Sequence, residues 1–518
     1  MTTPPRIHQI RKSVATRLLA HVGRSLILAA LAAAVASSAA PAEAQVSSTT
    51  GVSGRQPVTA ITADVAGVTL TTPVANTQYL EPADITLVVA VPGNSVQVDF
   101  YANGTKVGST RSWPFTLKWS AVPAGSYTLT ALALDFRGAA TASGPVPVLV
   151  KGIRNLPLVQ KSAFRRLGAF RLPAGTFGGS SFGYNGPIAF NPGRNSLYMV
   201  GHDWHQFVAE VSIPELRTSA SVADLAVASV LQPFADPIDG KKGTVNPGDP
   251  NEIKVGGLLA HKGNLIISEY AYYDGGGRQT LSHFVSTPDL SRTNDAQGPF
   301  QVTAPLAGYV SGYMGTIPTV WQGAMGATAL TGQCCIAIVG RTSSGPAVFA
   351  FNPGDVGTVS PIPAKPLVYY PEANATLGPW GNTSATYNGS SKITGVVFPE
   401  GTRSVLFFGR HGLGTFCYGT GAECADPTSE DKGVHAYPYV YQVWAYDAAE
   451  LVEVKNGARQ PWSVRPYAIW QLEFPTTAWS TSITGATYDA ATGRLFLSQG
   501  FVDGSRPVVH VYALDVAP

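Results

Sequence analysis

The chain has 518 residues, a formal net charge of +3 and only 13% charged residues. Five positive charges and one negative charge lie in residues 1–44, so the remainder carries about −1 and has no basic stripe, which excludes nucleic acid as an expected partner. The 55 glycines and 39 prolines, together with many Val, Thr, Tyr and Phe residues, are typical of a turn-rich all-β protein of two or three domains.

Residues 1–44 have the pattern of a secretory signal peptide. A basic leader precedes an apolar run from Leu26 to Ala36, and Ala42-Glu43-Ala44 follows. The run is too short to span a bilayer, and the Ala-x-Ala triplet predicts cleavage near Ala44. No later apolar run reaches spanning length, so we expect a secreted protein, extracellular or periplasmic, without membrane insertion.

Residues 45–65 are rich in Ser, Thr, Gly and Ala without periodicity, which predicts a flexible linker. Short alternating segments follow in residues 66–152, and Asn103-Gly104 between two of them predicts a tight hairpin. The segments 98–104, 113–115 and 122–131 resemble bacterial Ig-like domains found beside secreted enzymes and adhesins. The resemblance implies a β-sandwich that acts as a spacer or binding module and contributes no catalytic residue.

Residues 158–518 contain a unit that recurs five times. Each unit opens with a glycine and an apolar strand, at Gly186, Gly257, Gly326, Gly395 and Gly485. A second apolar strand, a third strand with an acidic or proline signature, and a fourth, more aromatic strand follow. The fifth unit lacks its fourth strand, whereas a matching segment, RLGAFRLPAG, precedes the first unit. This organisation resembles a five-bladed β-propeller whose N-terminal strand completes the last blade.

The propeller resemblance implies that the ends of the five second strands meet in one mouth. These ends are His202, Glu269, Arg341, Arg410 and Gln499. Because a guanidinium binds a carboxylate or phosphate through two hydrogen bonds and stays charged, we expect Arg341 and Arg410 to hold an acidic group. The alternative is an internal network in which Glu269 and Asp203 pair with the same arginines.

Aromatic and amide side chains are expected around the same mouth. The loops between units contribute Trp321, Gln322 and Trp479, and the tip loops contribute Tyr270 and Tyr418. Such groups bind sugars, although wedges between blades use the same residue types.

The four cysteines are expected to meet oxidising conditions. Cys417 and Cys424 are predicted to form a disulfide within the long insertion from His411 to Tyr439, which would act as a lid. Cys334 and Cys335 then form either a vicinal disulfide or two buried thiols.

The expected mouth resembles that of secreted glycan-active propeller enzymes. A polysaccharide lyase would bind a uronate with the two arginines, with His202 or His411 as base and Tyr270 or Tyr418 as acid. A glycoside hydrolase would instead use two or three carboxylates, for which Asp203, Glu269 and Glu252 are the candidates. The alternative is a noncatalytic glycan-binding or adhesion protein. A redox enzyme is a third hypothesis, which requires the vicinal disulfide beneath a cofactor.

The expected partner is an extracellular polysaccharide, bound by a monomer. No cofactor is predicted. The acidic residues between Asp236 and Glu252 lack the regular spacing of a calcium loop, so calcium has only weak support. No histidine pair at helical spacing or Cys-x-x-Cys motif indicates zinc.

Overall fold

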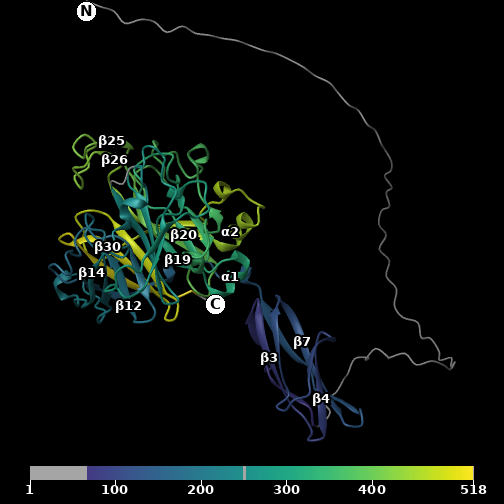
Figure 1. Cartoon of the computed structure of the whole chain (residues 1–518). Coiled ribbons are helices and arrows are strands. Elements are labelled where there is room, and N and C mark those ends of the chain that lie inside the picture. The colour runs from purple at the N-terminus through teal and green to yellow at the C-terminus, as the bar shows by residue number, and fades with distance from the viewer. Residues whose placement is uncertain (1–66, 249–251, 517–518) are drawn as a thin grey trace, which may run out of the picture. The chain divides into compact units, whose positions relative to one another are not determined.

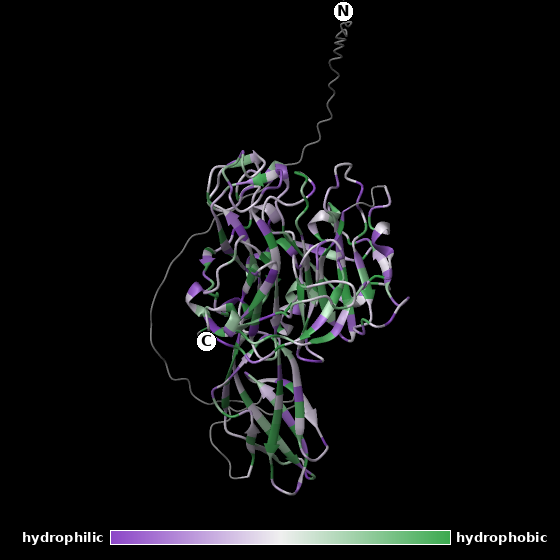
Figure 2. Ribbon diagram, turned by 90° about the vertical axis from the view of Figure 1, so that its left-hand side faces the viewer, coloured by the Kyte–Doolittle hydropathy of each residue, from purple (hydrophilic) through white to green (hydrophobic). Residues whose placement is uncertain are grey.

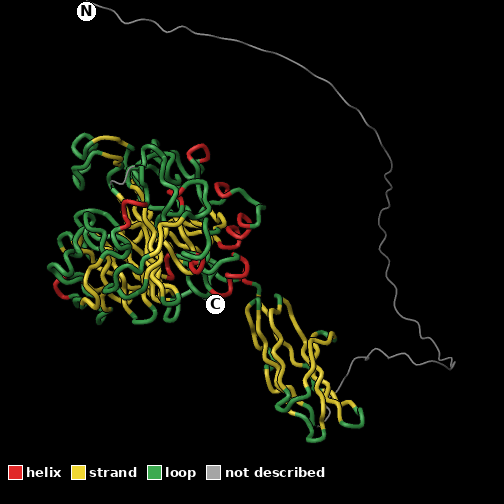
Figure 3. Tube along the Cα trace, in the orientation of Figure 1, coloured by secondary structure: helices red, strands yellow, loops and turns green. Residues whose placement is uncertain are grey.

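The computed structural model describes residues 67–248 and 252–516 (Figure 1). The predicted signal peptide and the whole predicted linker lie outside the described residues. Strands dominate the described part, and its α-helices are short: α1 (Thr319–Met325) and α2 (Ala448–Lys455) (Figure 3). Across these residues, we find no helix with the length and apolar character that a membrane crossing requires. The all-β fold class is therefore confirmed.

The N-terminal part contains two sheets that share one hydrophobic core. One sheet has the order β1-β3-β6, and the other has the order β2-β9-β7-β4-β5, with β8 paired to β7. The strands are β1 (Thr69–Thr72), β2 (Thr77–Leu80), β3 (Ala83–Ala90), β4 (Ser95–Ala102), β5 (Thr105–Thr110), β6 (Thr116–Val122), β7 (Gly125–Asp135), β8 (Ala140–Ala142) and β9 (Val146–Lys151).

Alternation along these strands builds the shared core. In β3 every second side chain is buried, because successive side chains point to opposite faces of a strand. Ile85 of the first sheet packs in one cluster with Phe100 and Leu129 of the second. The predicted hairpin is confirmed: Asn103 and Gly104 join β4 to β5 with φ of 50° and 76°.

The C-terminal part contains five four-stranded antiparallel sheets. Their orders are β11-β12-β13-β14, β15-β16-β17-β18, β19-β20-β21-β22, β23-β24-β27-β28 and β29-β30-β31-β10. The first two sheets comprise β11 (Ile188–Asn191), β12 (Ser196–Val200), β13 (Val208–Ser212), β14 (Val230–Ala235), β15 (Ile253–His261), β16 (Asn264–Ala271), β17 (His283–Ser286) and β18 (Gln297–Phe300). The third and fourth comprise β19 (Met314–Thr316), β20 (Ala329–Gly332), β21 (Val348–Phe351), β22 (Ala364–Val368), β23 (Lys392–Val397), β24 (Ser404–Gly412), β27 (Tyr439–Asp447) and β28 (Ala468–Leu472). The fifth comprises β29 (Ile483–Asp489), β30 (Arg494–Asp503), β31 (Arg506–Leu514) and β10 (Phe164–Arg171).

The N-terminal strand β10 pairs with the C-terminal strand β31, as the sequence predicted. Each first strand also contacts the first strand of the next sheet, in the succession β11, β15, β19, β23 and β29, and β29 contacts β11. Figure 2 shows hydrophobic residues concentrated on the strands of these sheets.

The recurring glycines permit these close approaches. A Cβ at Gly257 would lie 2.2 Å from the carbonyl oxygen of Gly312, and a Cβ at Gly395 would lie 2.4 Å from the Cβ of Ala486. Any larger residue would push neighbouring first strands apart, so the repeat requires glycine at these positions.

The strand prediction for the third unit is wrong. The sequence predicted the segment after Gly326 as the first strand of this unit, but that segment forms its second strand, β20. Residues 334–341, which were predicted to form the second strand, contain no strand. The side chain of Gln333 accepts a hydrogen bond from the Ser343 amide at 2.8 Å and donates one to the Gly345 carbonyl at 2.8 Å, so side-chain bonds replace a strand ladder. The apolar run instead buries Cys334 and Ile336 in a small separate cluster.

The same register shift recurs in three sheets and sets the positions of polar side chains. It falls between Val255 and Gly257 in β15, between Ile393 and Gly395 in β23, and between Ile483 and Gly485 in β29. Beyond the shift, Lys254 lies opposite Tyr270, and Lys392 lies opposite Arg410. The two lysines therefore occupy equivalent positions in the second and fourth units of the repeat.

Candidate functional site

A cavity of about 320 Å³ is lined by the loops that follow β16 and β20, by the start of β23, by the end of β24 and by the insertion that precedes β27. We call it the Lys392–Arg410 pocket. Its polar and aromatic lining includes Lys392, Arg410, Cys335, Tyr272, Tyr387, Trp380, Tyr418, Asp426, Asp431, His435 and Tyr439. A larger cavity, about 510 Å³, lies near Arg194 and Asp289. There Arg194 is already paired with the buried Glu210, so that cavity offers less unsatisfied charge.

Two cations lie side by side in the pocket. Lys392 on β23 is the cross-strand partner of Arg410 on β24, and like charges in this arrangement are unfavourable. Lys392 is exposed at the start of β23, and the neighbouring guanidinium lowers its pKa. Burial lowers the pKa of Arg410. These shifts mean that the protein holds the two charges close together at an energetic cost.

No carboxylate pairs directly with either cation within the described residues. Asp431 and Asp426 also line the pocket and act on Lys392 and Arg410 as charges at longer range. Neither Lys392 nor Arg410 forms a salt bridge there, and the buried Nε of Arg410 lacks a hydrogen-bond partner. The guanidinium carbon of Arg410 lies 4.4 Å from the ring centroid of Tyr439, which supports the cation without neutralising it. A pair of adjacent cations without a salt-bridge partner is suited to an anionic ligand.

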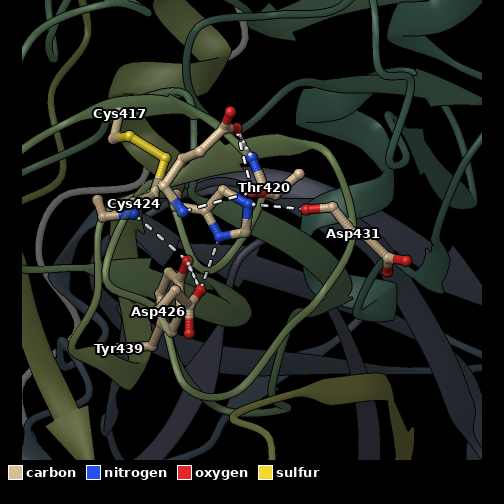
Figure 4. Close-up of a disulfide and its surroundings, with 9 residues drawn as sticks. Cys417, Thr420, Cys424, Asp426, Asp431 and Tyr439 are labelled. Carbon is tan, nitrogen blue, oxygen red and sulfur yellow. Dashed lines mark hydrogen bonds and ion pairs between the residues drawn. A yellow bond between two sulfur atoms is a disulfide. The ribbon is translucent and has the colours of Figure 1, made fainter.

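The insertion between β24 and β27 covers one side of the pocket. Within it, β25 (Cys417–Gly419) pairs with β26 (Gly433–His435), and the predicted disulfide between Cys417 and Cys424 is confirmed, with a Cα–Cα distance of 5.6 Å. We call the insertion, residues 413–438, the lid; Figure 4 shows the disulfide and its surroundings.

A buried carboxylate holds the lid to β27. Asp426 accepts hydrogen bonds from His435 Nδ1 and from the Tyr439 hydroxyl, each at 2.8 Å (Figure 4). Burial alone would raise the pKa of Asp426, but its hydrogen bonds with His435, Thr428 and Tyr439 lower it to about 2. Asp426 is therefore committed to internal bonds as a carboxylate and is poorly suited to donate a proton.

Cys335 and several aromatic rings complete the pocket. The Cys335 thiol lines it, whereas Cys334 is 4% exposed and lies with Tyr270 beneath the surface. Both cysteines are free thiols. Tyr418 on the lid is 68% exposed and presents its ring to solvent at the mouth.

The structure places only two of the predicted site residues in this pocket, Arg410 and Tyr418, beside the predicted disulfide. The five predicted strand ends do not share one register. Glu269 and Gln499 lie opposite Val255 and Ile483, whereas Arg410 is one position further along its strand. The residue of β24 that corresponds to Glu269 and Gln499 is Gly409, which lies opposite Ile393. Since successive side chains of a strand point to opposite faces, the Arg410 side chain points to the opposite face of its sheet from the one that Glu269 and Gln499 occupy in theirs.

Four predicted site residues are buried outside the pocket lining. Gln499 accepts hydrogen bonds from Thr476 at 2.6 Å and His510 at 2.9 Å, in an internal network. His411 lies 2.8 Å from the Ser391 hydroxyl through Nδ1, and burial lowers its pKa. Glu269 is 1% exposed, and Tyr270 is 6% exposed.

His202 and Trp479 belong to one row of contacting rings. The centroid distances are 5.2 Å from His202 to Tyr184, 5.8 Å from Tyr184 to Phe501 and 4.6 Å from Phe501 to Trp479. Asp203, next in the chain, forms a salt bridge with Lys254. The predicted internal pairing of Asp203 with a cation is thus present, but the cation is a lysine.

Arg341, Trp321 and Gln322 also lie outside the pocket lining. Arg341 packs over the loop at Gly277 and donates to the Asp274 carbonyl at 3.4 Å. Trp321 is 1% exposed in α1 and donates from its indole to the Thr402 carbonyl at 2.9 Å, so the predicted sugar platform is a core side chain. Gln322 donates to the Ile317 carbonyl at 3.0 Å.

The sequence reading missed Lys392 and the neighbouring Cys335 as site residues. One signal was present: Lys392 precedes Gly395 by three residues, as Lys254 precedes Gly257. Its proximity to Arg410 depends on the register shift in β23, which the apolar pattern does not encode. In the described residues, no group of three or more His, Cys, Asp or Glu side chains is arranged to hold a metal ion.

The comparison with protein families identifies one module. Residues 67–131 match the family model of the bacterial Ig domain. No curated protein sequence matches the chain. The Ig domain and the disulfide both fit an extracellular protein.

Several solved structures are similar to parts of the chain. The fibronectin(III)-like modules of Clostridium thermocellum CbhA are 32% identical over 16% of this chain and 94% of their own, with a TM-score of 0.16. The Bacteroides ovatus mixed-linkage glucan utilization locus SGBP-B, in complex with a mixed-linkage heptasaccharide, is 11% identical over 50% of this chain and 75% of its own, with a TM-score of 0.15. The exotype rhamnogalacturonan lyase YesX is 8% identical over 86% of this chain and 91% of its own, with a TM-score of 0.24. At these TM-scores, none of the three defines the fold or the function of this chain.

Proposed function

We propose that the chain is a secreted protein whose Lys392–Arg410 pocket binds an acidic extracellular polysaccharide and cleaves it by β-elimination. The observation that carries this proposal is the pair of adjacent cations without a salt-bridge partner among the described residues. A uronate carboxylate would supply the missing negative charge through charge-assisted hydrogen bonds.

We also propose that the five four-stranded sheets form the blades of a five-bladed β-propeller. The succession of contacts between first strands, which returns from β29 to β11, supports this arrangement. So does the pairing of β10 with β31, which joins the two ends of the repeat in one sheet.

Elimination requires a cation at the uronate, a base for the proton next to the carboxyl group and an acid for the leaving oxygen. Arg410 is the proposed cation because its guanidinium stays charged. Lys392 is the proposed base, since its lowered pKa leaves more of the neutral amine at a given pH. The proton moves to Lys392 Nζ, a carbon–carbon double bond forms, the bond to the leaving oxygen breaks, and Tyr418 protonates that oxygen.

Hydrolysis fits the pocket less well. A glycoside hydrolase needs one carboxyl group to act as a proton donor, and such a group needs a raised pKa. Asp426 has the opposite shift, to about 2. The predicted carboxylates Asp203 and Glu269 do not line the pocket.

The test is incubation of the full chain with uronate-containing and neutral polysaccharides, followed by assays for new reducing ends and for ultraviolet absorbance of an unsaturated product. We expect both signals with uronate polymers only. Arg410→Met should abolish them, whereas Arg341→Met, a change of the same kind outside the pocket lining, should not. Reducing ends without the chromophore would instead indicate hydrolysis, and retention on an affinity gel without either signal would indicate a noncatalytic glycan-binding protein.

A further inference from the structure

Two adjacent free cysteines occupy different environments beside the cations. Cys334 is buried with Tyr270 and Ile336, whereas Cys335 lines the pocket that contains Lys392 and Arg410. The segment that carries them has no ladder partner, and the Ile336 amide donates to the Cys334 carbonyl at 2.7 Å. One thiol is thus shielded and its neighbour is presented to a ligand-sized cavity.

The surroundings of Cys335 favour its thiolate. The titratable groups that face it are Cys334 from the same loop, Tyr270 and Tyr272 from β16 and the residue after it, Tyr387 from the loop before β23, Lys392 from β23 and Arg410 from β24. The hydrogen bond from Cys334 and the charge of Lys392 lower the pKa of Cys335 against the opposing effect of burial. The thiolate, not the thiol, is the nucleophile in disulfide exchange.

We propose that Cys335 is a modification site that undergoes thiol–disulfide exchange with anionic low-molecular-weight disulfides. The Cys335 thiol loses its proton to solvent, its sulfur bonds to one sulfur of the disulfide, and the other sulfur leaves as a thiolate and takes up a proton. One thiol and one disulfide thereby become a mixed disulfide and one small thiol, so atoms and electrons balance without a further oxidant.

The selectivity for anionic disulfides follows from the two cations. Lys392 and Arg410 attract a carboxylate-bearing reagent and hold it beside the sulfur, as they attract the polysaccharide in the proposed function. Local positive potential of this kind raises association rates by roughly 10-fold or more. The exchange requires no polysaccharide, so its failure and the failure of the proposed function are separate outcomes.

The product would close the site. A carboxylate-bearing group bonded to Cys335 would occupy a cavity of about 320 Å³ and neutralise its cations. The hydrogen bond with Cys335, followed by burial, raises the pKa of Cys334, so that thiol is a poor nucleophile for expelling the group. We therefore expect the mixed disulfide to persist until an external thiol reduces it.

The experiment compares alkylation of the full chain by iodoacetate, which is anionic, and iodoacetamide, which is neutral, with the modified residue located by mass spectrometry. We expect the iodoacetate-to-iodoacetamide rate ratio at Cys335 to be about 10-fold higher in the folded protein than in urea. Lys392→Gln should lower this ratio toward the unfolded value, whereas Lys365→Gln, a change of an exposed lysine on the outer strand β22, should not. The rate should rise with pH through a midpoint below the ordinary thiol value of about 8.5.

The disulfide reaction is then tested with oxidised glutathione. We expect a single glutathionyl adduct on Cys335, its absence in Cys335→Ser, and loss of polysaccharide binding that a reducing agent restores. Three results would overturn the proposal: reaction at Cys334 first, a rate ratio equal to that of the unfolded chain, or a purified protein in which Cys334 and Cys335 are already joined to each other.

Discussion

Replacement of Glu269 by glutamine should remove a strong pH dependence of stability. The side chain is 1% exposed, and its Oε2 has no hydrogen-bond partner among the described residues. Burial raises the pKa of Glu269 from 4.5 to about 8. The fifth sheet has Gln499 at the equivalent position, opposite Ile483 as Glu269 lies opposite Val255, so this site in the repeat accommodates an amide.

The sign and size of the effect follow from proton linkage. Below pH 4.5 Glu269 is protonated in both the folded and the unfolded protein, so its ionisation does not change the free energy of unfolding. Between pH 4.5 and about 8 the unfolded chain releases its proton and the folded chain does not, so the free energy of unfolding falls by about 1.4 kcal/mol per pH unit. Above pH 8 the free energy of unfolding is lower by about 5 kcal/mol in total. This loss corresponds to a melting temperature lower by about 6 °C for a domain of the size of the C-terminal part.

The assay is thermal unfolding of the wild type and Glu269→Gln across pH 4.5 to 9, with Glu215→Gln as a control at an exposed carboxylate. The two melting temperatures should coincide near pH 4.5, and the variant should exceed the wild type progressively above it. Glu269→Gln should also retain cleavage, because Glu269 does not line the pocket. Parallel curves for the variant and the wild type would refute the buried, protonated carboxyl group.

Three further predictions concern the lid, the core and the mouth of the pocket. Asp426→Asn should increase hydrogen exchange in the lid, residues 413–438. The lowered pKa of Asp426, about 2, corresponds to about 2 kcal/mol of stabilisation that is present above pH 4 and is lost as the pH falls through 2. Unchanged hydrogen exchange at pH 7 would contradict this role of Asp426. Trp321→Ala should cost about 3–5 kcal/mol of unfolding free energy, measured by urea denaturation, while any folded protein still binds ligand; loss of binding before loss of structure would reinstate Trp321 as a site residue. Tyr418→Ala should weaken polysaccharide binding by roughly threefold to tenfold without a change in melting temperature, and an unchanged dissociation constant would remove Tyr418 from the site.

Local chemistry made part of this architecture predictable from the sequence. Three of the recurring glycines, Gly257, Gly395 and Gly485, mark positions where a first strand approaches the next unit too closely for a side chain, and this requirement is visible in the sequence as a recurring glycine. Gly326 instead ends the helix α1. The Asn103-Gly104 turn and the pairing of Cys417 with Cys424 depend on nearby residues, so the sequence reading found both.

The site depended on features that a hydrophobic pattern does not contain. The segments ALTG and CCIAIVG are both apolar, so their composition does not reveal that the first is a strand and that the second is a loop beside the hydrogen bonds of Gln333. Lys392 meets Arg410 because of a register shift in β23. Trp321 lies in a helix of seven residues, too short to show a helical period, and its burial could not be foreseen.

The central claim is that Lys392 and Arg410 together form a binding site for a carboxylate. Isothermal titration calorimetry should compare a uronate oligosaccharide with the same oligosaccharide after its carboxyl groups are reduced to alcohols. We predict that the acidic form binds at least about 10-fold more tightly, and that Arg410→Met removes the difference, since a hydrogen bond to a charged group contributes about 1.5–3 kcal/mol. Equal affinities for the acidic and the reduced oligosaccharide, or a preference that survives Arg410→Met, would contradict the account.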